Sequence, residues 1–246
     1  MREIRIDINC DLGEGIGNDL KIMPFISSCS IACGGHTGTA ESMQGTVNLA
    51  MLHQVKIGAH PSYPDPKNFG RVSMNLNEEV FISSIRSQIE ALQFITIKSG
   101  TKLHHIKPHG ALYNDIAMND KKAIVFLKAV APFRESQKLY VPYKSRVSTI
   151  AIEQGFNVVS EAFADRRYSE ASTLVTRTNK NAILFNESDV LKQTLQIIKE
   201  KEVTVITGGL IPMKAQTICI HGDHPKAATI VKILAAELHK QKISIA

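Results

Sequence analysis

The chain has 246 residues, a formal net charge of +6 and an apolar fraction of 43%, which suits one large domain with a sizeable core. Lys and Arg are dispersed and no basic stripe alternates with aromatic residues, so nucleic-acid binding is not expected. The chain starts without an apolar signal segment, and its most apolar windows are short and carry lysines, which predicts no membrane span. Four cysteines without a C-x-x-C pair are typical of buried thiols in a reduced, cytoplasmic protein.

Strand-like apolar runs alternate with helical patterns along the whole chain. The runs cover residues 4–10, 26–33, 55–59, 103–106, 139–142, 157–161, 203–207 and 217–221. Helices are expected to begin at residues suited to helix starts, namely Asn77, Asn119, Ser145, and Asp223 with Pro225. The alternation predicts an α/β fold with a mostly parallel sheet. Since no linker, repeat or composition break divides the chain, one domain over residues 1–246 is expected.

Ionisable residues gather where the strand-like runs end. Early runs end in N-C-D-L-G-E, A-C-G-G-H and G-A-H-P; later ones end in I-K-P-H-G, lead into E-A-F-A-D-R, or end in C-I-H-G-D. Parallel strands in an α/β fold bring their carboxyl ends to one face, where the loops converge into a site. Packing alone does not require six runs to deliver ionisable groups to one rim, so the pattern predicts an enzyme.

The first run carries polar side chains on one face. Asp7, Asn9 and Asp11 alternate with apolar residues and should therefore point to the same side of a strand. Buried carboxylates are costly unless they are paired, so partners are expected inside the fold. Asp11 is a candidate general base and Asn9 a candidate substrate-binding residue, and a purely structural network is the alternative. Glu14 lies between two glycines, where a ligand can approach closely, and is a further catalytic candidate.

Five other candidates lie at or just beyond the ends of later runs: His36, His60, Lys107, His109 and His221. We expect His36 to bind substrate and the other four residues to take part in catalysis, where the histidines suit acid–base work near neutral pH. Asp11, His36 and His60 could instead supply an Asp-His-His set for a divalent metal. Because no local motif such as H-x-x-x-H accompanies them, the sequence assigns no metal ligands.

Guanidinium groups are expected near the same rim. Arg71, Arg166 and Arg177 fall in loops beyond strands, and the arginine fork suits a carboxylate or phosphate. Together they predict an anionic substrate, with Asp165 as a neighbouring catalytic candidate. Asp223 lies at the expected start of the last helix, where backbone amides can hold an anion, so it is a binding candidate or simply a helix cap.

Seven separated blocks carry a family resemblance. They are D-I-N-C-D-L-G-E, I-A-C-G-G-H-T-G, I-G-A-H-P-S-Y-P-D, N-F-G-R, I-K-P-H-G-A-L-Y-N, E-A-F-A-D-R-R-Y and T-I-C-I-H-G-D-H-P. In this order they resemble the family of the 5-oxoprolinase A component, also called LamB/YcsF or lactam-utilisation proteins. The resemblance implies a TIM-like (β/α) barrel with seven strands, of the glycoside hydrolase/deacetylase type. It also implies ATP-dependent cleavage of 5-oxoproline (pyroglutamate) to L-glutamate with subunits B and C, using ATP with Mg²⁺.

The chain departs from the usual family pattern at several positions: Ser30, Gly35, Thr37, Thr39, Val72 and Ser172. These departures are compatible with a divergent member that acts on another substrate. No G-x-x-x-x-G-K-[ST] loop is present, so nucleotide binding is not visible as a standard motif. Two alternatives stay open: a metal-dependent carbohydrate or amide deacetylase of the same barrel class that needs no ATP, and a non-catalytic component that only presents substrate.

Overall fold

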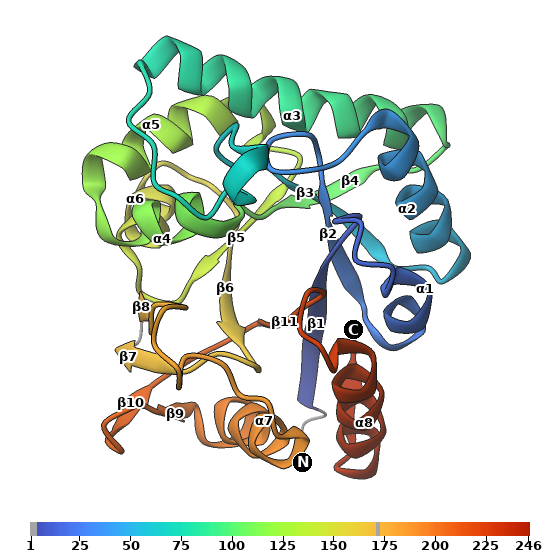
Figure 1. The fold of residues 1–246 in the computed structure, drawn as a ribbon, viewed down its shortest axis with the longest axis vertical. Coiled ribbons are helices and arrows are strands. Elements are labelled where there is room, and N and C mark those ends of the chain that lie inside the picture. Colours follow the sequence, from blue (N-terminus) through green and yellow to red (C-terminus); the bar gives the residue numbers. More distant parts are fainter. Residues whose placement is uncertain (1–3, 171–172) are drawn as a thin grey trace.

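Parallel strands close into a barrel in the computed structural model, which describes residues 4–170 and 173–246 and so leaves Ser172 outside the described residues. The strand order is β1-β2-β3-β4-β5-β6-β11, and β11 pairs back onto β1. The strands are β1 (Ile4–Leu12), β2 (Ser28–Ala32), β3 (Lys56–His60), β4 (Leu103–Ile106), β5 (Lys138–Pro142), β6 (Val158–Phe163) and β11 (Thr217–His221). The predicted seven-stranded, TIM-like barrel is confirmed (Figure 1).

Helices follow most of the strands and lie outside the ring (Figure 1). They are α1 (Asp19–Ile22), α2 (Ala40–Leu52), α3 (Glu78–Lys98), α4 (Gly110–Met118), α5 (Asp120–Val130), α6 (Arg146–Glu153), α7 (Glu187–Leu195) and α8 (Ala227–Lys240). Short helical turns are η1 (Met23–Phe25), η2 (Pro66–Asn68), η3 (Ala131–Phe133) and η4 (Gln196–Glu200). Within the described residues, no helix is both long and apolar enough to cross a membrane.

Three of the predicted helix starts are confirmed. Asn77, Asn119 and Ser145 each accept a backbone N–H bond in the first turn of α3, α5 and α6, which satisfies a donor that has no partner within the helix. The prediction for the last helix is wrong in detail. A turn held by bonds from His224 N to His221 O and from Ala227 N to His224 O delays the start of α8, and Asp223 does not cap it.

One strand-like run does not enter the barrel. Residues 203–207 contribute to β9 (Glu202–Thr204), which pairs antiparallel with β10 (Leu210–Pro212) in a separate two-stranded sheet. Gly208, with φ +90°, turns the chain straight back, whereas a parallel partner would need a long crossover. Three further strands are β7 (Tyr168–Glu170) and β8 (Thr173–Leu174), which form a hairpin, and β12 (Ile243–Ile245), which pairs with the start of β1.

The two faces of β1 separate core packing from polar chemistry, as predicted. Ile6, Ile8 and Cys10 are buried in the apolar core. On the other face, Asp7 accepts hydrogen bonds from the hydroxyls of Ser28 at 2.7 Å and Thr217 at 2.6 Å. The carboxylate of Asp7 therefore ties β1 to both neighbouring strands below the site, which is the structural role that the sequence left as the alternative.

Candidate active site

A cavity of about 460 Å³ opens at the carboxyl ends of the barrel strands. That size is ordinary for a pocket that takes a small molecule. Its lining includes many of the predicted site residues, from six different strand ends or loops: Asp11, His60, Arg71, Lys107, His109, Arg166, Arg177 and His221. The topology therefore brings together residues that lie far apart in the sequence.

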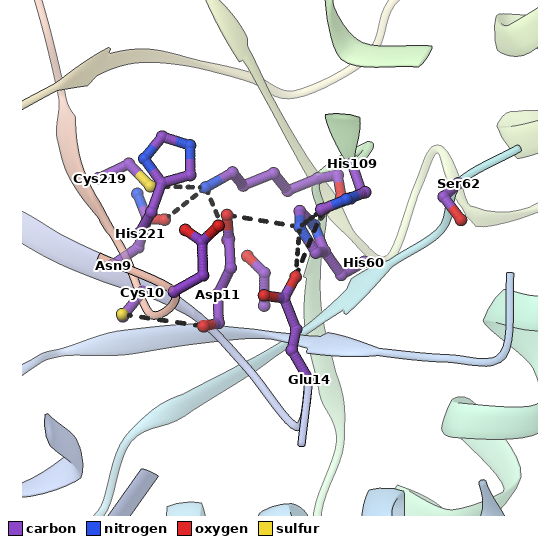
Figure 2. A network of polar contacts seen from close by, with 12 residues as sticks. Asn9, Cys10, Asp11, Glu14, His60, Ser62, His109, Cys219 and His221 are labelled. Carbon is purple, nitrogen blue, oxygen red and sulfur yellow. Dashed lines mark hydrogen bonds and ion pairs between the residues drawn. The ribbon is translucent and has the colours of Figure 1, made fainter. Parts of the chain in front are cut away.

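Lys107 lies at the floor of this cavity with its side chain only 1% exposed. Its Nζ donates to Asp11 Oδ1 at 2.8 Å and Asn9 Oδ1 at 2.9 Å and lies 2.9 Å from Cys219 Sγ; these three partners are labelled in Figure 2. It also lies 3.0 Å from Glu161 Oε1. An ammonium group has three protons to donate, so these acceptors occupy all of them. Lys107 is thus placed to hold Asp11 in position, and its protons are not directed at a substrate.

Opposite charges keep this buried pair ionised. Burial alone would lower the pKa of Lys107, but Asp11, Cys219 and Glu161 together raise that pKa well above its ordinary value. Burial would likewise raise the pKa of Asp11, but His60 and Lys107 hold it well below the ordinary value. Asp11 is therefore a carboxylate at neutral pH, as a general base or an electrostatic anchor requires.

Sequence reasoning missed part of this network. Glu161 is 2% exposed and pairs with Lys107, but it is not among the predicted site residues. Its position at the end of the predicted strand 157–161 is the signal that could have found it. Asn9 donates to Glu161 Oε1 at 2.8 Å and Thr217 Oγ1 at 2.7 Å. With its oxygen accepting from Lys107, the Asn9 side chain is engaged inside the barrel and does not line the cavity.

Asp165 and His221 form a second charged pair at the cavity wall. His221 Nδ1 lies 3.0 Å from both carboxylate oxygens of Asp165, and the His221 backbone N–H donates to Asp165 Oδ2 at 3.1 Å. Burial opposes the charge on Asp165, but the attraction and hydrogen bonds of His221 hold the pKa of Asp165 well below its ordinary value. An Nδ1–H donated to a carboxylate leaves His221 Nε2 free for proton transfer in the cavity.

A cluster of histidines lies beside Asp11. His60 Nε2 is 3.4 Å from Asp11 Oδ2 and 2.9 Å from His109 Nδ1. The rings of His36 and His109 stack with their centroids 3.7 Å apart. Glu14 Oε1 lies 3.2 Å from His36 Nε2. It also lies 3.4 Å from His109 Nδ1 (Figure 2). The predicted residues of four different loops or strand ends thus meet around one carboxylate.

Burial shapes the protonation of this cluster. It raises the pKa of Glu14 to about 7, with the negative charge of Asp11 adding to the effect. It lowers the pKa of His36 to about 3 and that of His109 well below the ordinary value, each reinforced by His60. One donor atom each from Glu14, His36 and His109 lies within 4.8 Å of the others, which makes these residues a possible metal-binding set. The set suggested by the sequence, Asp11 with His36 and His60, differs from it in two members.

Arginines lie around the mouth of the cavity. Arg71 and Arg177 both form ion pairs with Asp223, the latter at 3.4 Å. The attraction of His221 and of these two arginines outweighs burial, so the pKa of Asp223 lies below its ordinary value. Arg166 is buried and donates to Val175 O at 2.7 Å, which holds the loop beyond β6. Arg71 and Arg177 are therefore the arginines placed to meet an anionic ligand, whereas Arg166 is partly committed to backbone.

Two departures from the family pattern have structural explanations. Thr39 caps α2, accepting from Ser42 N at 3.1 Å, so a carboxylate is not needed for that cap. A Cβ on Gly35 would lie 2.3 Å from Gln88 Oε1 and 2.4 Å from Ser62 Oγ. Gln88 fills this space and bonds both the N–H and the C=O of Ser62. The glycine thus permits a local arrangement that fixes Ser62 beside His36.

Known proteins resemble the chain over almost its whole length. The model of the LamB/YcsF family matches residues 6–246. The A component of a 5-oxoprolinase from Bacillus anthracis is 42% identical over 246 residues, which cover 98% of this chain and 97% of that protein. The corresponding protein of Bacillus thuringiensis subsp. konkukian is 43% identical with the same coverage.

Solved structures agree in fold. A lactam utilization protein from Thermus thermophilus has a TM-score of 0.91 and 32% identity, covering 98% of this chain and 99% of that chain. A peptidoglycan deacetylase from Bacillus subtilis has a TM-score of 0.50 and 11% identity, covering 99% and 87%, a likeness of fold alone. With the barrel, the convergent site and the match over residues 6–246, the chain belongs to the LamB/YcsF family.

Proposed function

We propose that this chain is the A component of a cytoplasmic, ATP-dependent 5-oxoprolinase, which acts with subunits B and C to open 5-oxoproline (pyroglutamate) to L-glutamate. The names of the relatives at 42–43% identity support the substrate. One observation carries the proposal: a cavity that combines the Asp165–His221 pair, the Lys107–Asp11 pair and a rim of arginines. The Asp165–His221 pair supplies the acid–base group that hydrolysis of an amide needs, and the arginines suit an attached carboxylate, while the Lys107–Asp11 pair fixes a carboxylate at the floor of the cavity.

Binding of the substrate follows from the rim. 5-Oxoproline carries one carboxylate on a five-membered lactam ring. Arg71 and Arg177 line the cavity, and each has a guanidinium fork that can bind this carboxylate in place of part of its contact with Asp223. The ring amide would then point into the cavity, which Asp11, His60 and His221 line.

Hydrolysis of a lactam needs activation because resonance makes the amide carbon a poor electrophile. ATP with Mg²⁺ would supply it, since a phosphoryl group on the carbonyl oxygen makes that carbon electrophilic. His221 Nε2 would take a proton from the attacking water, while Asp165 stabilises the imidazolium that forms. His221 would return the proton to the ring nitrogen as the carbon–nitrogen bond breaks, which leaves the phosphoryl group on the new γ-carboxyl group as an acyl phosphate. A second water would then hydrolyse this acyl phosphate to L-glutamate and inorganic phosphate. The guanidinium groups at the rim are suited to phosphoryl oxygens as well as to a carboxylate.

The assignment is tested by reconstitution. The purified chain is combined with its candidate partner subunits, and glutamate formation from 5-oxoproline is measured with and without ATP. We expect turnover only with the full set and ATP. The assignment fails if the full set is inactive while a set from a homologous relative works under the same conditions. Turnover without ATP would point to an ATP-independent amide hydrolase instead.

The Asp165–His221 pair provides a sharper test. Asp165→Asn should lower kcat by about 10²–10⁴-fold, because His221 loses the carboxylate that orients its ring and stabilises the charged form. KM should change much less, since Asp165 does not line the cavity. A matched control is His53→Asn, which changes a histidine at the exposed end of α2. Unchanged turnover in Asp165→Asn would favour the non-catalytic, substrate-presenting role.

A further inference from the structure

In each histidine of the cluster beside Asp11, one ring nitrogen faces away from the cluster and the other faces into it; we call them the outer and the inner nitrogen. Each outer nitrogen donates to a fixed acceptor. His60 Nδ1 lies 2.7 Å from Lys107 O, and His109 Nε2 lies 3.0 Å from Phe69 O. Backbone carbonyls only accept, so both of these nitrogens carry the proton. His36 Nδ1 lies 3.0 Å from Ser62 Oγ, whose own proton is donated to Tyr63 O at 2.9 Å. Ser62 therefore accepts, and His36 Nδ1 also carries the proton.

The inner ring nitrogens are then all lone-pair acceptors in the neutral rings, and they face other acceptors. His60 Nε2 and His109 Nδ1 lie 2.9 Å apart with no proton assigned between them. His36 Nε2 and His109 Nδ1 both face Glu14 Oε1, at 3.2 Å and 3.4 Å. Lone pairs at such distances repel unless a positive centre lies among them. The arrangement thus requires either added protons or a cation.

The spacing around Glu14 matches a metal ion for two of the three ligand pairs. Two atoms bound to one tetrahedral zinc at about 2.0–2.1 Å lie about 3.3–3.4 Å apart. The distances from Glu14 Oε1 to the two ring nitrogens are 3.2 Å and 3.4 Å. The third pair, His36 Nε2 and His109 Nδ1, lies within 4.8 Å, and one of the two stacked rings must tilt for both nitrogens to reach one ion. In protein metal sites the ligating histidine typically donates its outer N–H to a carbonyl or carboxylate, which fixes the tautomer. We propose that Glu14, His36 and His109 bind a divalent transition-metal ion, with His60 as an adjacent fourth nitrogen.

The chemistry of the donors selects the kind of ion. Imidazole nitrogens suit zinc, cobalt, nickel or iron, whereas magnesium and calcium prefer oxygen ligands. The donor atoms are buried, with Glu14, His36 and His109 all in the interior. His60 and His109 line the cavity, so an ion on these nitrogens would lie at the edge of the substrate space. The site is distinct from the Asp165–His221 pair at the wall.

Metal content tests the proposal without any assay of turnover. The protein is stripped with a chelator, loaded with Zn²⁺ or Co²⁺, desalted and analysed for metal. We expect one ion per chain, and a visible absorption band for the Co²⁺ form that reports nitrogen and oxygen ligands. Absence of stoichiometric metal from the correctly folded wild-type protein would overturn the proposal, because added protons would then explain the cluster.

Variants locate the ion. His36→Ala and Glu14→Gln should each abolish stoichiometric binding, whereas His221→Ala removes a cavity histidine outside the cluster and should keep it. Ser62→Ala removes the partner of the outer His36 nitrogen, together with the bond of that hydroxyl to Tyr63 O, and leaves all three ligands in place. It should weaken affinity about 10–100-fold, so it remains informative if the ligand variants fold poorly. Equal metal binding in wild type, His36→Ala and Glu14→Gln would contradict the assignment.

The metal proposal goes beyond the proposed function and does not depend on it. A chain that binds one ion but forms no glutamate with its partners would keep the metal site and lose the 5-oxoprolinase assignment. A metal-free chain that supports ATP-dependent turnover would keep the 5-oxoprolinase assignment and lose the metal site.

Discussion

At the scale of single residues, Lys107 shows how burial turns a charge into a structural requirement. Its ammonium lies between two buried carboxylates, 2.8 Å from Asp11 and 3.0 Å from Glu161. An isolated charge in such a place would be very costly, and pairing is what makes each of the three tolerable. Removing one partner therefore does more harm than losing a single hydrogen bond.

Lys107→Met should lower the free energy of unfolding by about 3–5 kcal/mol, because it leaves Asp11 and Glu161 buried without their cation. Urea denaturation followed by circular dichroism measures the change. The double variant with Glu161→Gln should recover part of the loss, since one unpaired carboxylate is then removed. A loss below about 1 kcal/mol in the single variant would show that the network is not needed for stability.

At the scale of elements, the inside of the barrel is fitted across neighbouring strands. Gly58 on β3 pairs in register with His105 on β4. A Cβ on Gly58 would lie 2.1 Å from His105 Nε2, and the His105 ring stacks on Tyr140 of β5 with centroids 4.0 Å apart. The ring has little room to move away, so the absence of a side chain at position 58 sets the packing of three strands.

Gly58→Ala should therefore lower the free energy of unfolding by about 1–3 kcal/mol through overpacking. Gly45→Ala in α2 is the matched control, because a Cβ there would meet nothing within 4 Å. In a helix this control should be neutral or stabilising by up to about 1 kcal/mol. Thermal and urea melts of the two variants side by side test the contrast, and equal effects would refute the packing argument.

Local sequence signals predicted the elements well where periodicity and caps agree. The caps at Asn77, Asn119 and Ser145 and the polar strand ends at His60 and His221 could all be read from neighbouring residues. Contacts across the barrel could not be predicted in this way, because the pairing of Glu161 with Lys107 depends on how the strands close into a ring. The prediction that residues 203–207 form a barrel strand was wrong for a similar reason. Its apolar residues resemble a barrel strand, but the turn at Gly208 decides its partner.

At the scale of the whole molecule, buried histidines link stability to pH. Burial lowers the pKa of His104 to about 4, with the positive charges of Lys138 and Lys56 adding to the effect. Burial and the neighbouring His104 and Lys107 lower the pKa of His105 well below its ordinary value. In the unfolded chain both rings regain a pKa of about 6.5. At these two rings the folded protein therefore holds fewer protons than the unfolded chain below that pH, and the lowered pKa values of His36 and His109 act in the same direction.

The free energy of unfolding should accordingly fall as the pH drops from about 6.5 toward 4. Between these values the unfolded state binds up to about one extra proton for each of the two rings, so its population grows with acidity. The paired carboxylates Asp11 and Asp165 have pKa values below the ordinary range, so their protonation lowers the free energy of unfolding only at still lower pH. Urea denaturation at half-unit pH steps measures the slope, and the variant His104→Gln/His105→Asn, which cannot take up these protons, should show a shallower one. A slope in this variant as steep as in the wild type would assign the acid sensitivity to other groups, because only the titration of these two rings has been removed.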